Sequence, residues 1–345
     1  MRTVWQSEGG LSSRETCRSN GKKRVTNAAQ LFIKLRIVAL LLMTQLACLQ
    51  TLVAAPALTS TTDWHRTTWN GEKAWESTFA GWVAIISEER ARLVSIEEAA
   101  NGKNLLYAST KSEISWGGHR CWLGPQSKWK AIWDIWPPSA DWEASAAQSV
   151  TASGSILTVT HPHNDLKFPA LTRTYQWRDG VLHCNLIWQG GYHHAIHIVQ
   201  VPRGAIIHLH RSVTKDFPLG YGLPQVSGPV ETLADVPMKK EVGRLEGDRM
   251  TLWHANSIEK IAVEPQELTA DIGDCQLRIR RGAMKGMTAA APDHGLLTQV
   301  YLADWEHPFV ELEQLSNYAD GESAECEILI EPVHLKSSRE NLKPN

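Results

Sequence analysis

Residues 171–188, LTRTYQWRDGVLHCNLIW, decide the fold class. Two runs of β-patterned residues, 171–177 and 181–188, flank the pair Asp179-Gly180. Asp-Gly is the strongest short signal for a two-residue hairpin turn, because both turn positions need a positive φ, which Gly adopts freely and Asp tolerates. The stretch therefore predicts an antiparallel hairpin.

Short runs of the same kind continue on both sides of this hairpin. Upstream, residues 81–86 and 92–96 predict a second hairpin around a polar turn. Further strands are predicted at 156–160, 194–201, 205–211, 251–253, 258–263, 275–280, 297–303, 309–315 and 326–330. Many short, closely spaced strands are typical of an all-β protein, and their number favours a large two-sheet sandwich over an immunoglobulin-type one. The one weak helical pattern covers residues 88–100.

A tryptophan-rich stretch lies between these groups of strands. Residues 115–138, SWGGHRCWLGPQSKWKAIWDIWPP, hold five of the fifteen tryptophans together with glycine and proline pairs. Such residues predict a structured loop, and the flat apolar face of Trp suits stacking on a sugar ring. The alternative is that these rings only plug one end of the sandwich. The candidate sugar-binding residues in this stretch are Arg120, Trp122, Gln126 and Trp136.

The N-terminal 57 residues have the composition of an export signal. Residues 1–36 hold eight Lys or Arg against two Glu, and an apolar run at 37–55 ends in Ala55-Pro56-Ala57. A basic region, an apolar region and small residues at a cleavage site are typical of a secretory signal. We predict an exported protein, periplasmic or secreted. An uncleaved membrane anchor at 37–55 and a lipid on Cys48 are the alternatives.

The rest of the chain is predicted to be one domain. We expect a lead-in at 58–79, a β-supersandwich at 80–335 and a disordered tail at 336–345. Without the first 57 residues the net charge changes from −2 to −8, which argues against nucleic acid or an anionic membrane surface as a partner. We expect a monomer that touches a membrane only through an uncleaved anchor.

Metals and cofactors are not predicted. The four cysteines beyond the signal, Cys121, Cys184, Cys275 and Cys326, include no C-x-x-C pair, so their spacing neither indicates a zinc site nor fixes a disulfide pairing. The histidines at 161 and 163 flank a proline, and His194 and His197 would face opposite sides of a strand. No serine-hydrolase elbow, P-loop or dinucleotide fingerprint is present.

Several motifs resemble one bacterial family. They are GGHRCWLGPQ at 117–126, WPP at 136–138, FVELE at 309–313 and DGES at 320–323. On these motifs the chain resembles the DUF4380 family of exported bacterial proteins, which has no assigned reaction and is similar to the galactose mutarotase-like superfamily. The resemblance spans roughly residues 80–331. It implies a β-supersandwich whose concave sheet binds a carbohydrate.

The resemblance also implies candidate catalytic residues. Epimerases of the superfamily move protons at an anomeric carbon with a histidine as general acid and a glutamate as general base. The glutamate would lie on a late strand, where Glu311 and Glu313 share one face, and Glu313 is our preference. The chain lacks the Asn-His-x-Tyr-Phe-Asn-Leu type motif of epimerases and has YHHAIH at 192–197 instead. From there we take His194 as the acid, with His197 as its alternative and His193 as a binding residue.

The sequence therefore leaves two alternative predictions of function. The first is carbohydrate binding or modification, with aldose 1-epimerase-like proton transfer as its chemistry. The second is non-catalytic glycan binding or a structural role in the cell envelope. The first requires a histidine and a glutamate that converge across one sugar ring, whereas the second requires only aromatic and polar contacts. A solvated sheet face is the plain alternative for the two glutamates.

Overall fold

The computed structural model describes residues 62–109, 117–125, 140–164, 166, 168–190, 193–224, 237–302 and 308–335. They belong to one compact unit, Leu58–Asn345. Within the described residues the only helices are α3 (Ala140–Glu143) and the 3-10 turn η1 (Asp293–Gly295), and none is long and apolar enough to cross a bilayer. The predicted signal and the predicted C-terminal tail lie outside these residues.

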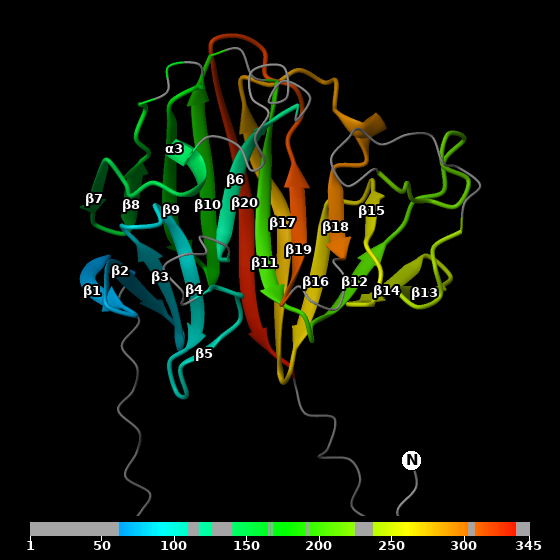
Figure 1. Ribbon diagram of the computed structural model, residues 1–345, viewed down its shortest axis with the longest axis horizontal. Helices are drawn as coiled ribbons and strands as arrows, with labels where there is room; N and C mark the ends of the chain where they lie inside the picture. Colours follow the sequence, from blue (N-terminus) through cyan, green and yellow to red (C-terminus); the bar gives the residue numbers. More distant parts are fainter. Residues whose placement is uncertain are drawn as a thin grey trace, which may run out of the picture. The chain divides into compact units, whose positions relative to one another are not determined.

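The largest layer is a ten-stranded antiparallel sheet in the order β13-β14-β12-β16-β17-β20-β10-β9-β8-β7 (Figure 1). Its side chains alternate between buried and half-exposed along most strands, so one face is packed and the other meets solvent. Its strands are β7 (Ser149–Ser153), β8 (Ile156–Thr160), β9 (Leu171–Arg178), β10 (Val181–Gln189), β12 (Ile206–His210), β13 (Gly243–Glu246), β14 (Arg249–Trp253), β16 (Glu267–Ile272), β17 (Cys275–Lys285) and β20 (Ser323–His334).

The predicted central hairpin is confirmed. Strands β9 and β10 pair from Val181 opposite Arg178 onward, and the two residues between them have φ of 49° (Asp179) and 83° (Gly180). Both turn residues therefore adopt the left-handed conformation that the Asp-Gly signal predicts.

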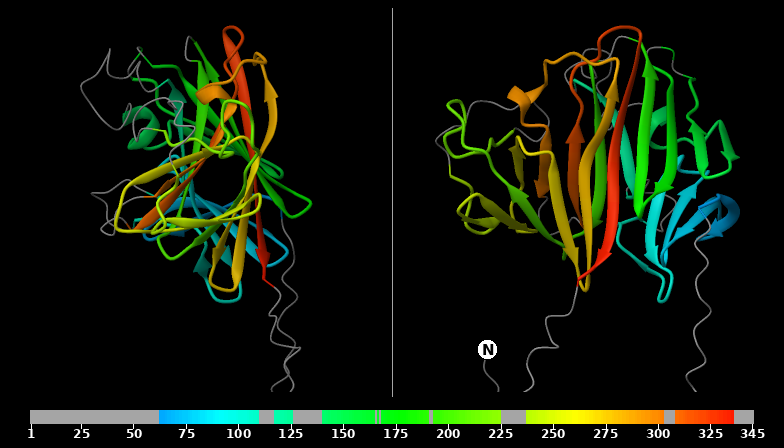
Figure 2. Two further views of the ribbon diagram at one scale, coloured as in Figure 1. Left: turned by 90° about the vertical axis from the view of Figure 1, so that its right-hand side faces the viewer. Right: turned by 180° about the vertical axis from the view of Figure 1, so that it is seen from behind.

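A five-stranded antiparallel sheet packs against the first one. Its order is β15-β18-β19-β11-β6. The bounds are β6 (His119–Gly124), β11 (His194–Pro202), β15 (Glu259–Val263), β18 (Thr298–Leu302) and β19 (Phe309–Leu315). Val199 and Leu312 belong to the same buried cluster as Leu277 and Ile328 of the larger sheet, so the two sheets form a sandwich (Figure 2). The all-β, two-sheet fold class is thus confirmed.

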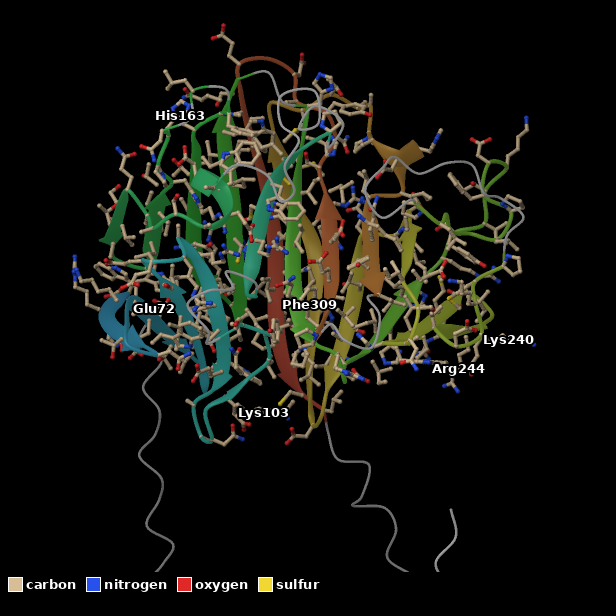
Figure 3. All side chains as sticks on the ribbon, in the orientation of Figure 1. Glu72, Lys103, His163, Lys240, Arg244 and Phe309 are labelled. Atoms are coloured by element: carbon tan, nitrogen blue, oxygen red, sulfur yellow. The ribbon has the colours of Figure 1, made fainter. Side chains whose placement is uncertain are left out.

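A third sheet covers one end of the sandwich. It runs β1-β2-β3-β4-β5 in chain order. The bounds are β1 (His65–Trp69), β2 (Glu72–Phe79), β3 (Trp82–Ser87), β4 (Arg92–Glu98) and β5 (Lys103–Asn104). Its Leu93 and Ile96 join the central core, and Lys103 Nζ lies 2.5 Å from the Asp274 carboxylate of the large sheet (Lys103 is labelled in Figure 3).

The structure corrects several sequence expectations. The weak helical pattern at 88–100 does not form a helix; strand β4 lies there and confirms the strand predicted at 92–96. Residues 65–79, to which no strand was assigned, contain β1 and β2. Strands β7, β13 and β16 were also not predicted. Within the tryptophan-rich stretch, His119–Gly124 is not a loop but β6, an edge strand buried at every position. Residues 110–116 and 126–139 lie outside the described residues.

Candidate functional site

Polar and charged side chains meet on one side of the five-stranded sheet. Residues that are directly paired across neighbouring strands share a side. Glu311 is paired with Gln200 and with Tyr301, and Glu313 is paired with Ile198. We call this side the polar face. Its polar and aromatic members are Arg120, Trp122, Gln200, Lys260, Gln299, Tyr301, Glu311 and Glu313.

The two glutamates share the polar face, as their spacing predicts, but they are not solvated. Glu311 is 9% exposed and Glu313 is 4% exposed. Glu311 Oε1 accepts hydrogen bonds from Arg120 Nη1 at 3.0 Å and from Gln200 Nε2 at 2.7 Å. Glu313 Oε2 lies 2.8 Å from Lys260 Nζ. Each carboxylate is thus held by a cation of a different strand, and the plain alternative of a solvated face is wrong.

Burial raises the pKa of the Glu311 carboxyl above its ordinary value. The opposing influence of Arg120 is the next largest, and the negative charge of Glu313 raises the pKa further. A carboxylate with a raised pKa holds protons near neutral pH more readily than an exposed one, and this is the property of a general base or acid.

A buried ion-pair network holds the Arg120 side chain in place. Glu143 of α3 accepts a hydrogen bond from Arg120 Nε at 2.8 Å and lies 3.2 Å from Arg92 Nη1 of β4. The Glu143 backbone carbonyl also accepts from Arg92. Burial acts to raise the pKa of Glu143, but Arg92 and Arg120 together outweigh it and lower that pKa. The network fixes Arg120 with its second nitrogen directed at Glu311.

Trp122 anchors this network rather than offering an open ring. Its Nε1 donates to Glu143 Oε2 at 2.8 Å, and the Arg120 guanidinium lies over its ring, 4.5 Å from the centroid. Trp122 is only 3% exposed and belongs to a buried cluster with Trp142 and Trp188. Arg120 and Trp122, both predicted to bind sugar, therefore contact each other in a cation–π interaction that positions the guanidinium.

The candidate histidines lie away from the glutamates. His194 is on the polar side of β11 but is paired with Gly124, four residues from the position paired with Glu313, a separation of about 13 Å along the strand. The ring of His194 lies over Gly124 and contacts Tyr318 edge-on. His193 contacts the same Tyr318 ring.

His197 lies on the other side of the sheet. We call that side, which packs on the ten-stranded sheet, the inner face. The opposite orientations predicted for His194 and His197 are present, so His197 cannot contact a ligand held by Glu311. The predicted binding residues Gln126 and Trp136 lie outside the described residues.

Sequence reasoning missed Arg92, Glu143, Gln200 and Lys260. Arg92 opens strand β4, RLVSIEE, and is fully buried although both ends of that strand are polar. A fully buried charge needs a partner, but the polar ends of the strand give no sign that Arg92 is buried. The partner itself, 51 residues away on a four-residue helix, carries no local signal.

A separate groove lies on the outer face of the ten-stranded sheet. It has a volume of about 220 Å³ and is polar. Across it, His183 Nδ1 lies 2.7 Å from Glu327 Oε1, and Asn185 donates to Glu325. Of the predicted site residues that the structure describes, none lines this groove.

Comparison with solved structures identifies the fold. A galactose mutarotase-like protein from Lactobacillus casei superposes with a TM-score of 0.51 at 14% sequence identity, over 75% of this chain and 100% of that one. A galactose mutarotase-like protein from Clostridium acetobutylicum superposes with a TM-score of 0.50 at 7% identity, over 79% and 98% of the two chains. The chain thus has a galactose mutarotase-like fold.

The comparisons define the fold and not the family. No family model and no curated protein matches the sequence. The resemblance to DUF4380 therefore stays a prediction, whereas the superfamily fold that it implies is confirmed.

Proposed function

We propose that the polar face binds a carbohydrate and that Glu311 serves as the general base in anomer exchange. The observation that carries this proposal is the buried carboxylate of Glu311, with its raised pKa, held between Arg120 and Gln200 on a galactose mutarotase-like sheet. In this reaction the base takes the proton of the anomeric hydroxyl while an acid protonates the ring oxygen. The ring C–O bond then breaks, and closure on the other face exchanges the anomers.

The structure favours Glu311 as the general base, whereas the sequence led us to prefer Glu313. Glu313 is engaged by Lys260 and its side chain is 6% exposed, whereas that of Glu311 is 12% exposed. Because a base must reach the proton that it takes, the more accessible carboxylate is the better candidate.

The proton donor must come from residues other than the predicted histidines. Tyr301 is paired with Glu311 on the neighbouring strand and is half-buried on the same face. Directly paired residues have Cβ atoms about 4.5–5.5 Å apart, so the side chains of Tyr301 and Glu311 can both contact the same sugar ring. We propose Tyr301 as the proton donor to the ring oxygen of the sugar. Lys260, which is paired with Tyr301 on the next strand, is the second candidate.

A non-catalytic carbohydrate-binding role is the second candidate. Two observations support it. Among the described residues, no histidine lies in the line of cross-strand pairs that contains Glu311 or in the line that contains Glu313. Both glutamates are also already in ion pairs. We also propose export, on the composition of residues 1–57. N-terminal sequencing of the protein recovered from culture medium and periplasm tests this proposal: a new N-terminus near Leu58 supports it, and an intact Met1 in the cytoplasm overturns it.

The test of the function is anomer exchange measured by NMR on the full-length chain, with glucose, galactose and glucuronate. We expect faster exchange than the uncatalysed rate, reduced by about 10²-fold or more in Glu311→Gln. Glu327→Gln is the matched control, because Glu327 is also a partly buried, hydrogen-bonded glutamate, but on the other sheet.

The outcomes separate the candidates. Binding in a titration without exchange would favour the non-catalytic role. Loss in Glu327→Gln but not in Glu311→Gln would move the site to the groove of the ten-stranded sheet. If no sugar binds, both functions are wrong.

A further inference from the structure

Three potential metal ligands meet on the inner face of the five-stranded sheet. His119 and Cys121 are two residues apart on β6 and therefore point to the same side. His197 of β11 is paired directly with Cys121. All three side chains are 0–1% exposed. The cluster thus arises from the strand register, beneath the side that carries Arg120 and Trp122.

The ligand atoms of the cluster form a small triangle. His119 Nε2 and His197 Nδ1 are 3.0 Å apart, and Cys121 Sγ lies 3.4 Å from the first and 3.5 Å from the second. A point equidistant from the three atoms lies about 1.9 Å from each, whereas metal–imidazole bonds are about 2.0–2.1 Å and metal–thiolate bonds about 2.3 Å. An ion slightly out of the plane, or an expansion of the triangle by a few tenths of an ångström, brings all three distances into the bonding range.

We propose that His119, Cys121 and His197 form a mononuclear copper(I) site. Two imidazoles and one thiolate in a trigonal arrangement are typical of protein copper centres, and soft thiolate ligands select Cu(I). Cys121 binds as the thiolate, and its proton is released to solvent. The two imidazoles bind in their neutral form through the nitrogens that now face each other.

Zinc fits the same cluster less well. A structural zinc ion takes four ligands, and this cluster offers three. The charge of the surroundings also decides against a dication, because the Arg173 guanidinium lies close by and donates to the His119 carbonyl oxygen at 2.9 Å. One Cu(I) and one thiolate are neutral together, whereas Zn²⁺ and one thiolate leave a buried positive charge beside Arg173.

The site is independent of the proposed carbohydrate chemistry. It lies on the opposite side of β6 and β11 and is closed by the second sheet, so no sugar reaches it. An ion bound here joins an edge strand to its neighbour at the level of Cys121. It would thereby stabilise the strand that carries Arg120.

The experiment uses the full-length chain, loaded with Cu(I) under anaerobic reducing conditions and dialysed against a Cu(I)-specific chelator. We expect one copper per chain to be retained and the melting temperature to rise. Cys121→Ala should lose the copper and the shift, whereas Cys184→Ala, which removes another buried free cysteine, should keep both. His197→Gln provides a second test, since it retains the thiol. Circular dichroism establishes that each variant is folded.

The spectroscopic signature identifies the ligands. X-ray absorption of the copper-loaded chain should show one sulfur and two imidazole nitrogens. Retention of copper in folded Cys121→Ala or His197→Gln, or no retention by the wild type, would overturn the site. Tight binding of Zn²⁺ in preference to Cu(I) would overturn the choice of metal.

Discussion

At the scale of residues, the feature that organises the site is a set of buried charges. Arg92, Arg120 and Glu143 are each less than 5% exposed, and together they connect β4, β6 and α3. A charge at such a place costs several kcal/mol of desolvation, which only its partners offset. The sequence shows neither that Arg92 is buried nor that its partner is Glu143, because both depend on tertiary packing.

Removing one member of this network should destabilise the protein strongly. We expect Glu143→Gln to lower the free energy of unfolding by about 3–5 kcal/mol, since it leaves the buried Arg92 guanidinium without a carboxylate and Arg120 with Glu311 alone. Urea denaturation measures the change. Arg244→Ala, at an exposed pair with Glu246, is the control and should have almost no effect (Arg244 is labelled in Figure 3). A loss in Glu143→Gln as small as that of the control would contradict the structure.

The raised pKa of Glu311 predicts a pH dependence of defined sign. Its folded pKa lies above the ordinary value of 4.5 because of burial, so the folded state binds the proton more tightly than the unfolded state does. The stabilisation from this group is fully present below about pH 4.5 and is lost as the pH rises through the folded pKa.

Comparison with Glu311→Gln isolates this contribution. The free energy of unfolding of the wild type minus that of the variant should fall as the pH rises above 4.5. Urea denaturation at a series of pH values measures it. A difference that increases with pH would show that Arg120 and Lys260 lower the pKa of Glu311 below its ordinary value instead. Anomer exchange, if present, should follow the same ionisation and increase with pH.

At the scale of elements, strand β6 is the one on which sequence and structure differ most. The flanking glycines and prolines indicate a loop, yet its six residues pair with β11 at the edge of the sheet and are all buried. Such a strand shows no regular alternation of apolar and polar residues, because both of its faces are covered. The hairpins, whose signals are local, were predictable; β6 depends on contacts with two other layers.

Gly118 shows how closely β6 approaches the N-terminal sheet. It has a φ of 72°, and a Cβ there would collide with the Leu93 carbonyl oxygen. We expect Gly118→Ala to destabilise the protein by well over 1 kcal/mol and to displace Arg120. Gly71→Ala is the matched control, because Gly71 also has a positive φ (84°) but open space around it, and its cost should stay near 1 kcal/mol. Equal effects in thermal or urea denaturation would show that backbone strain alone matters.

At the scale of the whole molecule, one core connects the three sheets. A single buried cluster includes Leu93 of the N-terminal sheet, Val199 of the five-stranded sheet and Ile328 of the ten-stranded sheet. Phe309, labelled in Figure 3, begins the strand whose Val310 and Leu312 belong to the same cluster. Sequence patterns predict the individual strands and the sandwich class, but not this connection, since the period of a strand does not reveal which sheet it faces.

A shared core predicts cooperative unfolding. Leu93→Ala should cost about 2–5 kcal/mol and lower the midpoint for the whole domain. Tryptophan fluorescence and far-ultraviolet circular dichroism should report the same transition. Two separate transitions would show that the N-terminal sheet is an independent folding unit.

The position of β20 bears on how the protein is made. This strand follows every other described strand in the chain, yet it lies between β17 and β10 in the ten-stranded sheet. While the ribosome is still synthesising residues 323–334, both flanks of the sheet expose an unpaired edge, and such edges aggregate readily. The ten-stranded sheet can therefore close only after residues 323–334 have been synthesised, and until then its two open edges are sites at which nascent chains can associate.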